Sequence, residues 1–181
     1  YPEKNLAGVG IAFKLLQALY LKLDKPIPHL FDYLDLVALG TVADIVSLTG
    51  ENRALVKAGL IKLSKTKWIG LKALISACGL EGKSLDTGKI GFVLAPRLNA
   101  AGRLKSAEDA VKLLITNDLD EARKRADALN KDNEERQKIC AEIEEQAEKM
   151  LEHDDVCSMK VIVLCDERWH SGVIGIVASR L

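Results

Sequence analysis

Long hydrophobic runs are missing from this chain of 181 residues. No apolar stretch reaches the roughly 18 residues that a membrane span needs, and no charged-then-apolar leader resembles a signal peptide. Aromatic side chains are also scarce, with two tryptophans, three tyrosines and three phenylalanines, so aliphatic residues must supply most of the core. These absences indicate a cytoplasmic protein that has no membrane partner.

Local metal-ligand spacing is also absent. The four cysteines form no C-x-x-C pair, and the three histidines are too scattered to complete a zinc motif with them. These residues are Cys78, Cys140, Cys157, Cys165, His29, His153 and His170. We therefore expect free, buried thiols in a protein of the reducing cytosol.

The formal net charge of the chain is zero, but the positive and negative residues are unevenly distributed along the sequence. Residues 1–107 hold 15 Lys/Arg and 8 Asp/Glu, whereas residues 108–181 hold 11 and 18. Between Arg53 and Lys105, 11 basic residues meet only Glu81 and Asp86. This stretch can supply a phosphate-binding surface whose affinity falls with salt; a lysine-rich solvated surface is the equally weighted alternative.

The first two thirds of the chain show helical periodicity. The spacing predicts helices over 5–23, 30–41, 52–64, 69–78, 86–94 and 109–116. The first of these is expected to be buried on most sides, and 30–41 could instead be a buried strand. We expect the helix that Asp86 caps to stop before Pro96, and residues 96–104 to form a turn of small residues.

A longer helix is predicted over 119–151, because apolar positions recur at alternating spacings of three and four from Leu119 to Met150. Two polar residues, Asn133 and Arg136, interrupt this inward stripe at its middle. A polar window of this kind fits a connector between two lobes, with the window facing a cleft. Local hydrogen bonding within a helix pair explains the same pattern equally well.

The period changes after this helix. Residues 160–165 are apolar and rich in β-branched side chains, which predicts a buried strand. A loop and the start of a helix packed on that strand follow, and the chain begins without Met and ends inside an apolar helix. We therefore expect a fragment: a mainly helical part that a long helix joins to the first strand and helix of a second lobe.

The segment 35–44 is the most informative stretch, because a carboxylate stands at each end of an otherwise apolar run. A carboxylate drawn into an apolar wall is costly unless it is paired, hydrogen-bonded or bound to a metal. Asp44 is the sharper case, since no basic residue follows it until Arg53. The simpler alternative is that Asp44 caps a following turn or helix.

Several polar residues are candidates for phosphate contacts. Arg97 and Arg103 flank small residues that let a backbone approach closely, and guanidinium groups bind phosphate oxygens in pairs. Asn99 lies between them and could position a sugar or phosphate. The remaining candidates are Arg53 at a helix start, His170 in a loop, and Asn133 with Arg136 at the polar window.

Five segments together resemble the RecJ family of single-stranded-DNA-specific exonucleases, within the DHH phosphoesterase superfamily. They are residues 6–14, 35–44, 52–53, 96–104 and 170–181. The resemblance implies a fragment of a two-lobed α/β phosphoesterase. Residues 1–117 would then be the C-terminal part of the DHH catalytic domain, 118–152 the long connecting helix, and 153–181 the start of the DHH-associated domain. The Asp-His-His triplet that names the superfamily would precede Tyr1.

The resemblance also implies two divalent cations, Mn²⁺ or Mg²⁺, held by aspartates and histidines of four motifs. Asp44 matches the metal-binding aspartate of the fourth motif, so we expect it to be both a metal ligand and a catalytic residue. A single carboxylate cannot build a two-metal site. We therefore expect this chain by itself to hold no cation stably and to have no nuclease activity.

The activity that the resemblance implies is digestion of single-stranded DNA from its 5′ end in bacterial recombination and repair, with release of mononucleotides. The implied partners are single-stranded DNA, a repair helicase and a single-strand-binding protein. Two rivals stay open. One is a phosphodiesterase for oligoribonucleotides or cyclic dinucleotides, and the other is a non-catalytic helical module that binds proteins through its acidic long helix.

Overall fold

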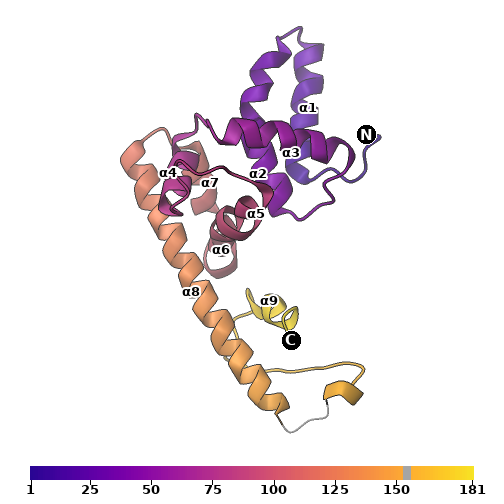
Figure 1. The fold of residues 1–181 in the computed structure, drawn as a ribbon, viewed down its shortest axis with the longest axis vertical. Coiled ribbons are helices and arrows are strands. Elements are labelled where there is room, and N and C mark those ends of the chain that lie inside the picture. Colours follow the sequence, from indigo (N-terminus) through magenta and orange to yellow (C-terminus); the bar gives the residue numbers. More distant parts are fainter. Residues whose placement is uncertain (153–155) are drawn as a thin grey trace.

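The computed structural model describes residues 1–152 and 156–181, and most of them lie in helices (Figure 1). The boundary expected at residue 153, and His153 itself, lie outside the described residues. The elements are α1 (Gly8–Lys22), η1 (Ile27–Tyr33), α2 (Leu34–Ala43), α3 (Gly50–Leu63), α4 (Ile69–Ala77), α5 (Thr87–Lys89), η2 (Ile90–Leu94), α6 (Ala95–Leu104), α7 (Glu108–Ile115), α8 (Leu119–Leu151), η3 (Val156–Ser158) and α9 (Ile174–Ala178). Of the η elements, η1 and η3 are 3₁₀-helices, and η2 is a π-helix.

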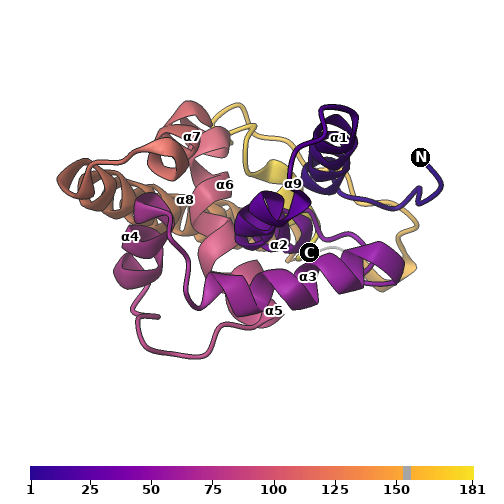
Figure 2. The same ribbon diagram turned by 90° about the horizontal axis from the view of Figure 1, so that it is seen from above.

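The first core cluster joins α1, η1, α2 and α3. In Figure 2, α2 lies between α1 and α3. Phe13, Leu30, Val37 and Leu55 supply one buried side chain from each of the four elements. The helices α2 and α3 approach so closely that a Cβ atom on Gly59 would lie 2.2 Å from the carbonyl oxygen of Leu34. Glycine is therefore the residue that this crossing accommodates.

The second and larger core cluster packs α4, η2 and α7 against the first half of α8. Leu74, Ile90, Leu113 and Ala126 are each at most 1% exposed and come from these four elements. Leu39 of α2 belongs to the same cluster, so the two cores share α2. This arrangement fixes α2 and α6, which flank η2, relative to the long helix.

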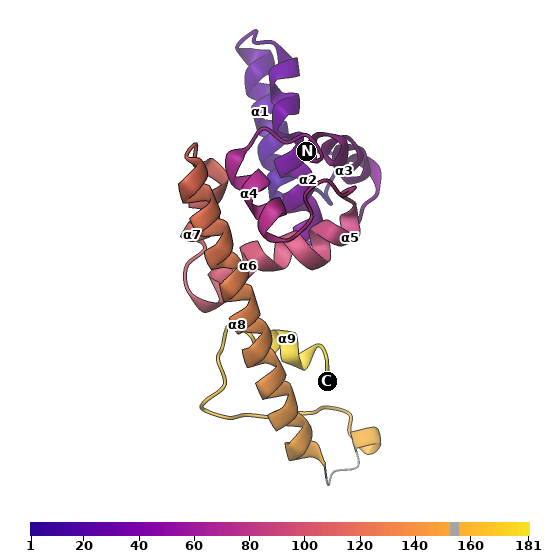
Figure 3. The same ribbon diagram turned by 60° about the vertical axis from the view of Figure 1, so that its left-hand side comes forward.

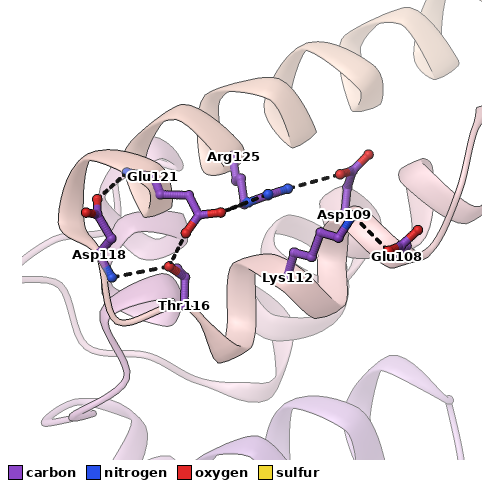
Figure 4. Close-up of polar contacts among 7 residues, drawn as sticks. All are labelled: Glu108, Asp109, Lys112, Thr116, Asp118, Glu121 and Arg125. Carbon is purple, nitrogen blue, oxygen red and sulfur yellow. Dashed lines mark hydrogen bonds and ion pairs between the residues drawn. The ribbon is translucent and has the colours of Figure 1, made fainter.

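Polar contacts fix the point where α8 begins (Figure 4). The side chain of Asp118 accepts a hydrogen bond from the backbone N–H of Glu121 at 2.8 Å, which caps the helix. The Glu121 carboxylate in turn accepts from the Thr116 hydroxyl and from Arg125, and Arg125 also pairs with Asp109 of α7 at 3.1 Å. The hydroxyl of Thr116 and the guanidinium of Arg125 hold the pKa of Glu121 below its usual value.

The second half of α8 carries α9 (Figure 3). Cys140 and Ile143 of α8 pack against Val173 and Val177, and Leu104 at the end of α6 joins this cluster. The predicted extent of the long helix, 119–151, is confirmed, and most of its predicted inward residues are buried. The exceptions are Arg136, which is half-buried, and the two ends, since Leu119 and Met150 are 49% and 44% exposed.

The predicted stop before Pro96 is wrong. The chain continues from α5 through η2 into α6, and the segment 96–104, expected to be a turn, is helical. Proline removes a backbone donor and its ring crowds the carbonyl of the preceding turn. A π-helical segment directly before α6 widens that turn, and the Arg97 side chain donates to the carbonyl of Val93 at 2.7 Å.

The expectation that the first helix is buried on most sides is also wrong for the described structure. Only Gly10 and Phe13 of α1 are buried, while Ile11, Leu15 and Leu21 are more than half exposed. One face of α1 packs on α2 and η1, and its other apolar faces have no described residue against them.

The buried strand expected at 160–165 does not form within the described residues. This segment has no regular secondary structure, pairs with no described strand, and exposes 74% of Val161 and 83% of Val163. A strand needs a neighbouring strand to satisfy its backbone groups, and the described chain offers none. The helix α9, expected to pack on that strand, packs on α8 instead.

The cysteines were expected to be free, buried thiols. Cys78, Cys140 and Cys165 are free; Cys140 is buried, Cys78 is half-buried and Cys165 is exposed, so burial of the thiols holds only in part. The side chain of Cys157 is outside the described set.

Over the ranges that the structure describes, no helix has both the length and the apolar character required to cross a membrane.

Candidate functional site

Two helix ends and one helix face surround an open pocket of about 720 Å³. Its lining residues are Ala7, Gly8 and Val9 at the start of α1, Gly40, Ala43, Asp44 and Ile45 at the end of α2, and Asn99, Gly102 and Arg103 on α6. The spacing of three and four residues places the α6 residues on one face of that helix. The pocket thus brings together three predicted site residues: Asp44, Asn99 and Arg103.

Asp44 follows the last residue of α2, with its backbone N–H bonded to the carbonyl of Gly40 at 3.0 Å. Its side chain is exposed on the pocket and makes no hydrogen bond or ion pair with any described residue. The C-terminus of a helix carries a partial negative charge. A carboxylate at that position is unfavourable by itself and becomes favourable when a cation binds there.

The start of α1 faces the same pocket with the opposite polarity. Ala7 is the N-cap residue and supplies no side-chain acceptor, so the first-turn N–H groups of α1 have no side-chain cap. A helix N-terminus of this kind favours anions, phosphate groups among them. The positive end of α1 and the negative end of α2 therefore suit a cation and a phosphate bound side by side.

The backbone next to Asp44 is strained. Ile45 has φ = 55°, a left-handed conformation that is rare for a β-branched residue, and it is 91% exposed. Its N–H bonds to the carbonyl of Val42 at 3.2 Å, so it turns the chain sharply at the end of α2. Glycine normally occupies this position after a helix. Strain held next to a functional side chain is a common feature of binding sites.

The expectation that Asp44 is drawn into an apolar wall is wrong in the described structure. The alternative that it caps a following turn or helix is wrong as well, because its side chain accepts no hydrogen bond from a described residue. The buried carboxylate of this segment is Asp35, which is 2% exposed. It accepts hydrogen bonds from the Thr66 hydroxyl at 2.6 Å and from the Trp68 indole N–H at 3.0 Å. Asp35 is therefore a satisfied core carboxylate, and Asp44 is free to bind a ligand.

Arg103 and Asn99 are the exposed polar residues on the α6 side of the pocket. The Arg103 guanidinium donates to the carbonyl of Gly172 at 3.3 Å, which connects α6 with the segment before α9. Arg97 lies elsewhere on α6: its Nε donates to the side-chain oxygen of Asn130 on α8 at 2.7 Å. Because it is half-buried and bonds two protein oxygens, Arg97 joins α6 to α8.

Arg53 and His170 do not line this pocket. Arg53 is exposed on α3, at a smaller pocket of about 300 Å³ that Lys57 and Thr87 also line. His170 is exposed in the loop before α9, where its Nδ1 accepts from the N–H of Gly172 at 3.1 Å. His170 therefore lies close in sequence and space to the residue that Arg103 contacts.

The polar window of α8 is partly internal. Asn133 is 2% exposed, and its side-chain oxygen accepts from the guanidinium of Arg136 at 2.9 Å. Arg136 is half-buried, and its buried Nε has no hydrogen-bond partner among the described residues. Burial is the main cause that lowers the pKa of the Arg136 guanidinium from its ordinary value.

Sequence reasoning missed two features of the pocket. The glycine-rich start of α1 was part of the resemblance, yet neither Ala7 nor Gly8 was predicted to line the site. The small side chains of Ala7 and Gly8 could have indicated this part of the site, because they allow a ligand to approach the backbone N–H groups of the first turn. The strain at Ile45 has no sequence signal, because isoleucine ordinarily argues against a left-handed conformation.

Among the described residues that line this pocket, Asp44 supplies the only carboxylate. A carboxylate oxygen is a ligand suited to Mg²⁺ or Mn²⁺, and Asp44 presents one without a competing partner. Among the described residues, no group of three or more His, Cys, Asp or Glu side chains could hold a metal ion. Asp44 therefore has the chemistry of one ligand, and a complete metal site would need further ligands from outside the described residues.

Comparison with known proteins places this geometry in context. No family model matches the chain. It is 42% identical over all its 181 residues to the single-stranded-DNA-specific exonuclease RecJ of Bacillus subtilis, and covers 22% of that protein. The chain spans between about a fifth and a third of the RecJ relatives that it matches over its full length.

Solved structures give the same result. The crystal structure of RecJ from Thermus thermophilus in complex with Mn²⁺ matches with a TM-score of 0.86 and 43% identity, over 99% of this chain and 26% of that one. The corresponding complex with Mg²⁺ also has a TM-score of 0.86, with 28% of that chain covered. These similarities confirm the predicted resemblance and the mainly helical fragment of a larger fold.

Proposed function

We propose that this chain, whose sequence and fold correspond to part of RecJ, contributes a metal-binding aspartate and phosphate-binding groups to a single-stranded-DNA-specific exonuclease. The whole protein would cleave phosphodiester bonds in single-stranded DNA from the 5′ end and release mononucleotides. The observation that carries the proposal is the pocket that Asp44 shares with Asn99 and Arg103. Asp44 lies at the end of α2, the other two residues lie on α6, and the start of α1 lines the same pocket.

Asp44 would provide one carboxylate ligand for a divalent cation, Mn²⁺ or Mg²⁺. Such a cation, when bound, neutralises phosphate charge and lowers the pKa of a bound water. The exposed carboxylate and the negative end of α2 both favour the cation. The strained turn at Ile45 fixes the direction in which Asp44 leaves the helix.

The groups opposite Asp44 would bind the substrate phosphate. The uncapped N-terminus of α1 and the Arg103 guanidinium both favour an anion in the same pocket. Asn99 would donate or accept a hydrogen bond at the sugar or phosphate. Phosphate contacts position a strand without reading its bases, which fits digestion regardless of sequence.

The other predicted contacts have supporting roles in this proposal. Arg97 would keep α6 in position through Asn130, whereas Arg53, His170 and the Asn133–Arg136 pair would meet the strand outside the pocket. We further propose that residues 1–117 and 153–181 belong to two domains joined by the helix of 118–152. Cytoplasmic location, and partnership with a repair helicase and a single-strand-binding protein, remain predictions.

The substitution Asp44→Asn in the full-length protein tests the proposal. It preserves shape and removes the charge, so manganese-dependent digestion of single-stranded DNA should fall by at least about 1,000-fold, since each 1.36 kcal/mol of lost transition-state stabilisation costs tenfold. Binding of single-stranded DNA and the thermal unfolding midpoint should remain near the wild-type values.

The matched control is Asp24→Asn, since Asp24 is an exposed carboxylate with φ = 52° that asparagine also tolerates. Its turnover should equal that of the wild type. The isolated 181-residue chain, which brings one carboxylate to the pocket, should be inactive. Turnover by Asp44→Asn within about tenfold of the wild type, a change of under 1.4 kcal/mol, would reject the metal role.

A further inference from the structure

Three arginines belong to different elements that meet in one apolar cluster, which includes Leu104, Cys140 and Val177. Arg103 is near the end of α6, Arg136 is at the middle of α8, and Arg180 follows α9. The apolar cluster fixes these elements together, with Leu104 from α6 among its members. Packing of this cluster therefore fixes the backbone positions from which the three side chains extend.

Arg136 is the central member of this arginine cluster. Asn133 orients its guanidinium, and its buried Nε has no acceptor in the described part of the chain. Burial lowers the pKa of Arg136 most; the Cys140 thiol opposes this, and the charges of Arg103 and Arg180 add to the lowering. A half-buried cation with an unsatisfied donor and two like charges nearby is stabilised by an anion.

The counter-charges around these arginines are few. No described carboxylate forms an ion pair with Arg103 or Arg136, and the Arg103 side chain donates to the Gly172 carbonyl. Arg180 pairs with Glu144 of α8 at 2.7 Å, with both side chains partly exposed. An ion pair of this exposure contributes little to stability, so Arg180 can exchange Glu144 for a stronger acceptor at small cost.

The α6 and α9 sides of the cluster are in direct contact. A Cβ atom on Gly172 would lie 2.2 Å from the carbonyl oxygen of Arg103. Only glycine permits this approach, and the approach brings the segment that leads to Arg180 next to Arg103. Arg103 also lines the Asp44 pocket, so the pocket and the arginine cluster share one residue.

We propose that Arg103, Arg136 and Arg180 form a second phosphate-binding subsite, which holds a backbone phosphate of the single strand beyond the nucleotide at Asp44. Without DNA, the Arg180 guanidinium pairs with the Glu144 carboxylate. The phosphate would replace that carboxylate when the strand binds. This inference rests on the proposed function, and it adds Arg180 and Glu144 to the residues that determine DNA binding.

A DNA phosphodiester is the anion that fits best. It carries several acceptor oxygens at one centre, which lets more than one guanidinium bind the same group. Its negative charge does not depend on the pH range in which proteins work, and successive phosphates repeat along the strand. A strand that occupied the cluster would continue past Arg103 into the Asp44 pocket.

Salt dependence of DNA binding tests the subsite without catalysis. The 181-residue chain is titrated with a labelled oligothymidine in EDTA at several salt concentrations, by fluorescence anisotropy. Losing one phosphate contact to a single strand makes the negative slope of log K against log salt less steep by about 0.7. Arg136→Gln and Arg180→Gln should each reduce the steepness by that amount and weaken binding several-fold.

Two further variants distinguish the subsite from a structural role. Arg123→Gln, on the exposed side of the same long helix, should leave the slope unchanged. Glu144→Gln releases Arg180 and should strengthen binding, whereas loss of a merely structural ion pair would not. Thermal unfolding of each variant confirms that it is folded.

Unchanged slopes for both Arg136→Gln and Arg180→Gln, or weaker binding by Glu144→Gln, would overturn the subsite. Absence of salt-dependent binding by the wild-type chain would overturn it as well. None of these results bears on Asp44, whose test measures turnover, so the subsite and the proposed function can fail separately.

Discussion

At the scale of single residues, the two carboxylates of segment 35–44 lie nine positions apart. On a helix of about 3.6 residues per turn, that spacing places them on opposite faces. If one faces the core, the other faces solvent. Asp35 faces the core, where Thr66 and Trp68 satisfy it, and Asp44 faces the pocket. The same helix phase that buries one carboxylate makes the other available to a ligand.

The strain at Ile45 leads to a stability prediction. A non-glycine residue in the left-handed region costs roughly 1–2 kcal/mol, and glycine adopts that region freely. Because the side chain is 91% exposed, its removal loses almost no burial. Ile45→Gly should therefore raise the free energy of unfolding by about 1 kcal/mol, after allowance for the greater chain entropy of glycine in the unfolded state. Urea denaturation measures this change.

The control for that prediction is another exposed isoleucine with ordinary helical geometry. Ile61 on α3 is 69% exposed, and Ile61→Gly should lower the unfolding free energy by about 0.5–1 kcal/mol, the usual cost of glycine in a helix. Opposite signs for the two variants support the strain. A loss of stability in Ile45→Gly similar to that in Ile61→Gly would show that the left-handed turn costs nothing.

The identity of the site residues was partly predictable from sequence. Asp44, Asn99 and Arg103 were each identified as candidates, and the structure brings them to one pocket. Their burial was not predictable, because a pattern of apolar neighbours does not give the phase of a helix relative to its core. Arg97 was predicted to bind phosphate, yet its nearest partners are the protein oxygens of Asn130 and Val93.

At the scale of elements, periodicity predicts a helix well when it persists over many turns. The helix α8 has the predicted ends because its apolar stripe runs through 33 residues and Asp118 caps its start. The segment around Pro96 was not predictable in the same way. A proline argues for a helix end, and the π-helical turn that accommodates it depends on packing against neighbouring elements.

The crossing of α2 and α3 leads to the next prediction. Gly59→Ala would place a Cβ atom 2.2 Å from the Leu34 carbonyl oxygen and 2.5 Å from the Ala38 Cβ. The helices must then separate, and overpacking of this kind typically costs about 1–3 kcal/mol. The unfolding free energy from urea titration should fall by that amount or more.

Gly8→Ala is the matched control, because a Cβ atom there meets no atom within 4 Å. Alanine also has a higher helix propensity than glycine, so this variant should be neutral or slightly stabilising. Equal stability of the Gly59→Ala and wild-type chains would mean that α2 and α3 can separate at no cost, contrary to their close packing.

At the scale of the whole molecule, α8 holds the parts of the chain together. Its first half packs on α4, α6 and α7, its second half carries α9, and the arginine cluster lies where the two halves meet. Two apolar regions stay exposed: one face of α1, and the segment 160–165. Sequence patterns predict that such residues are apolar enough to be buried, but they do not predict which polypeptide covers them.

The charges of the site do not follow the asymmetry along the chain, because Asp44 lies in the basic part (1–107) while Arg136 and Arg180 lie in the acidic part (108–181). The arginines and the α1 N-terminus attract a polyanion, while Asp44 and the end of α2 attract a cation. In the proposed function they would provide the two halves of a metal-dependent phosphodiester site, although each half is incomplete among the described residues. This combination is the central claim, and it depends on Asp44 contacting a cation.

A crystal structure of the full-length protein grown with Mn²⁺ tests that claim most directly. We predict that a carboxylate oxygen of Asp44 lies in the inner coordination sphere of a cation, with Arg103 lining the same pocket. A structure in which the cation binds elsewhere and the Asp44 side chain hydrogen-bonds only to nearby backbone amides would contradict it.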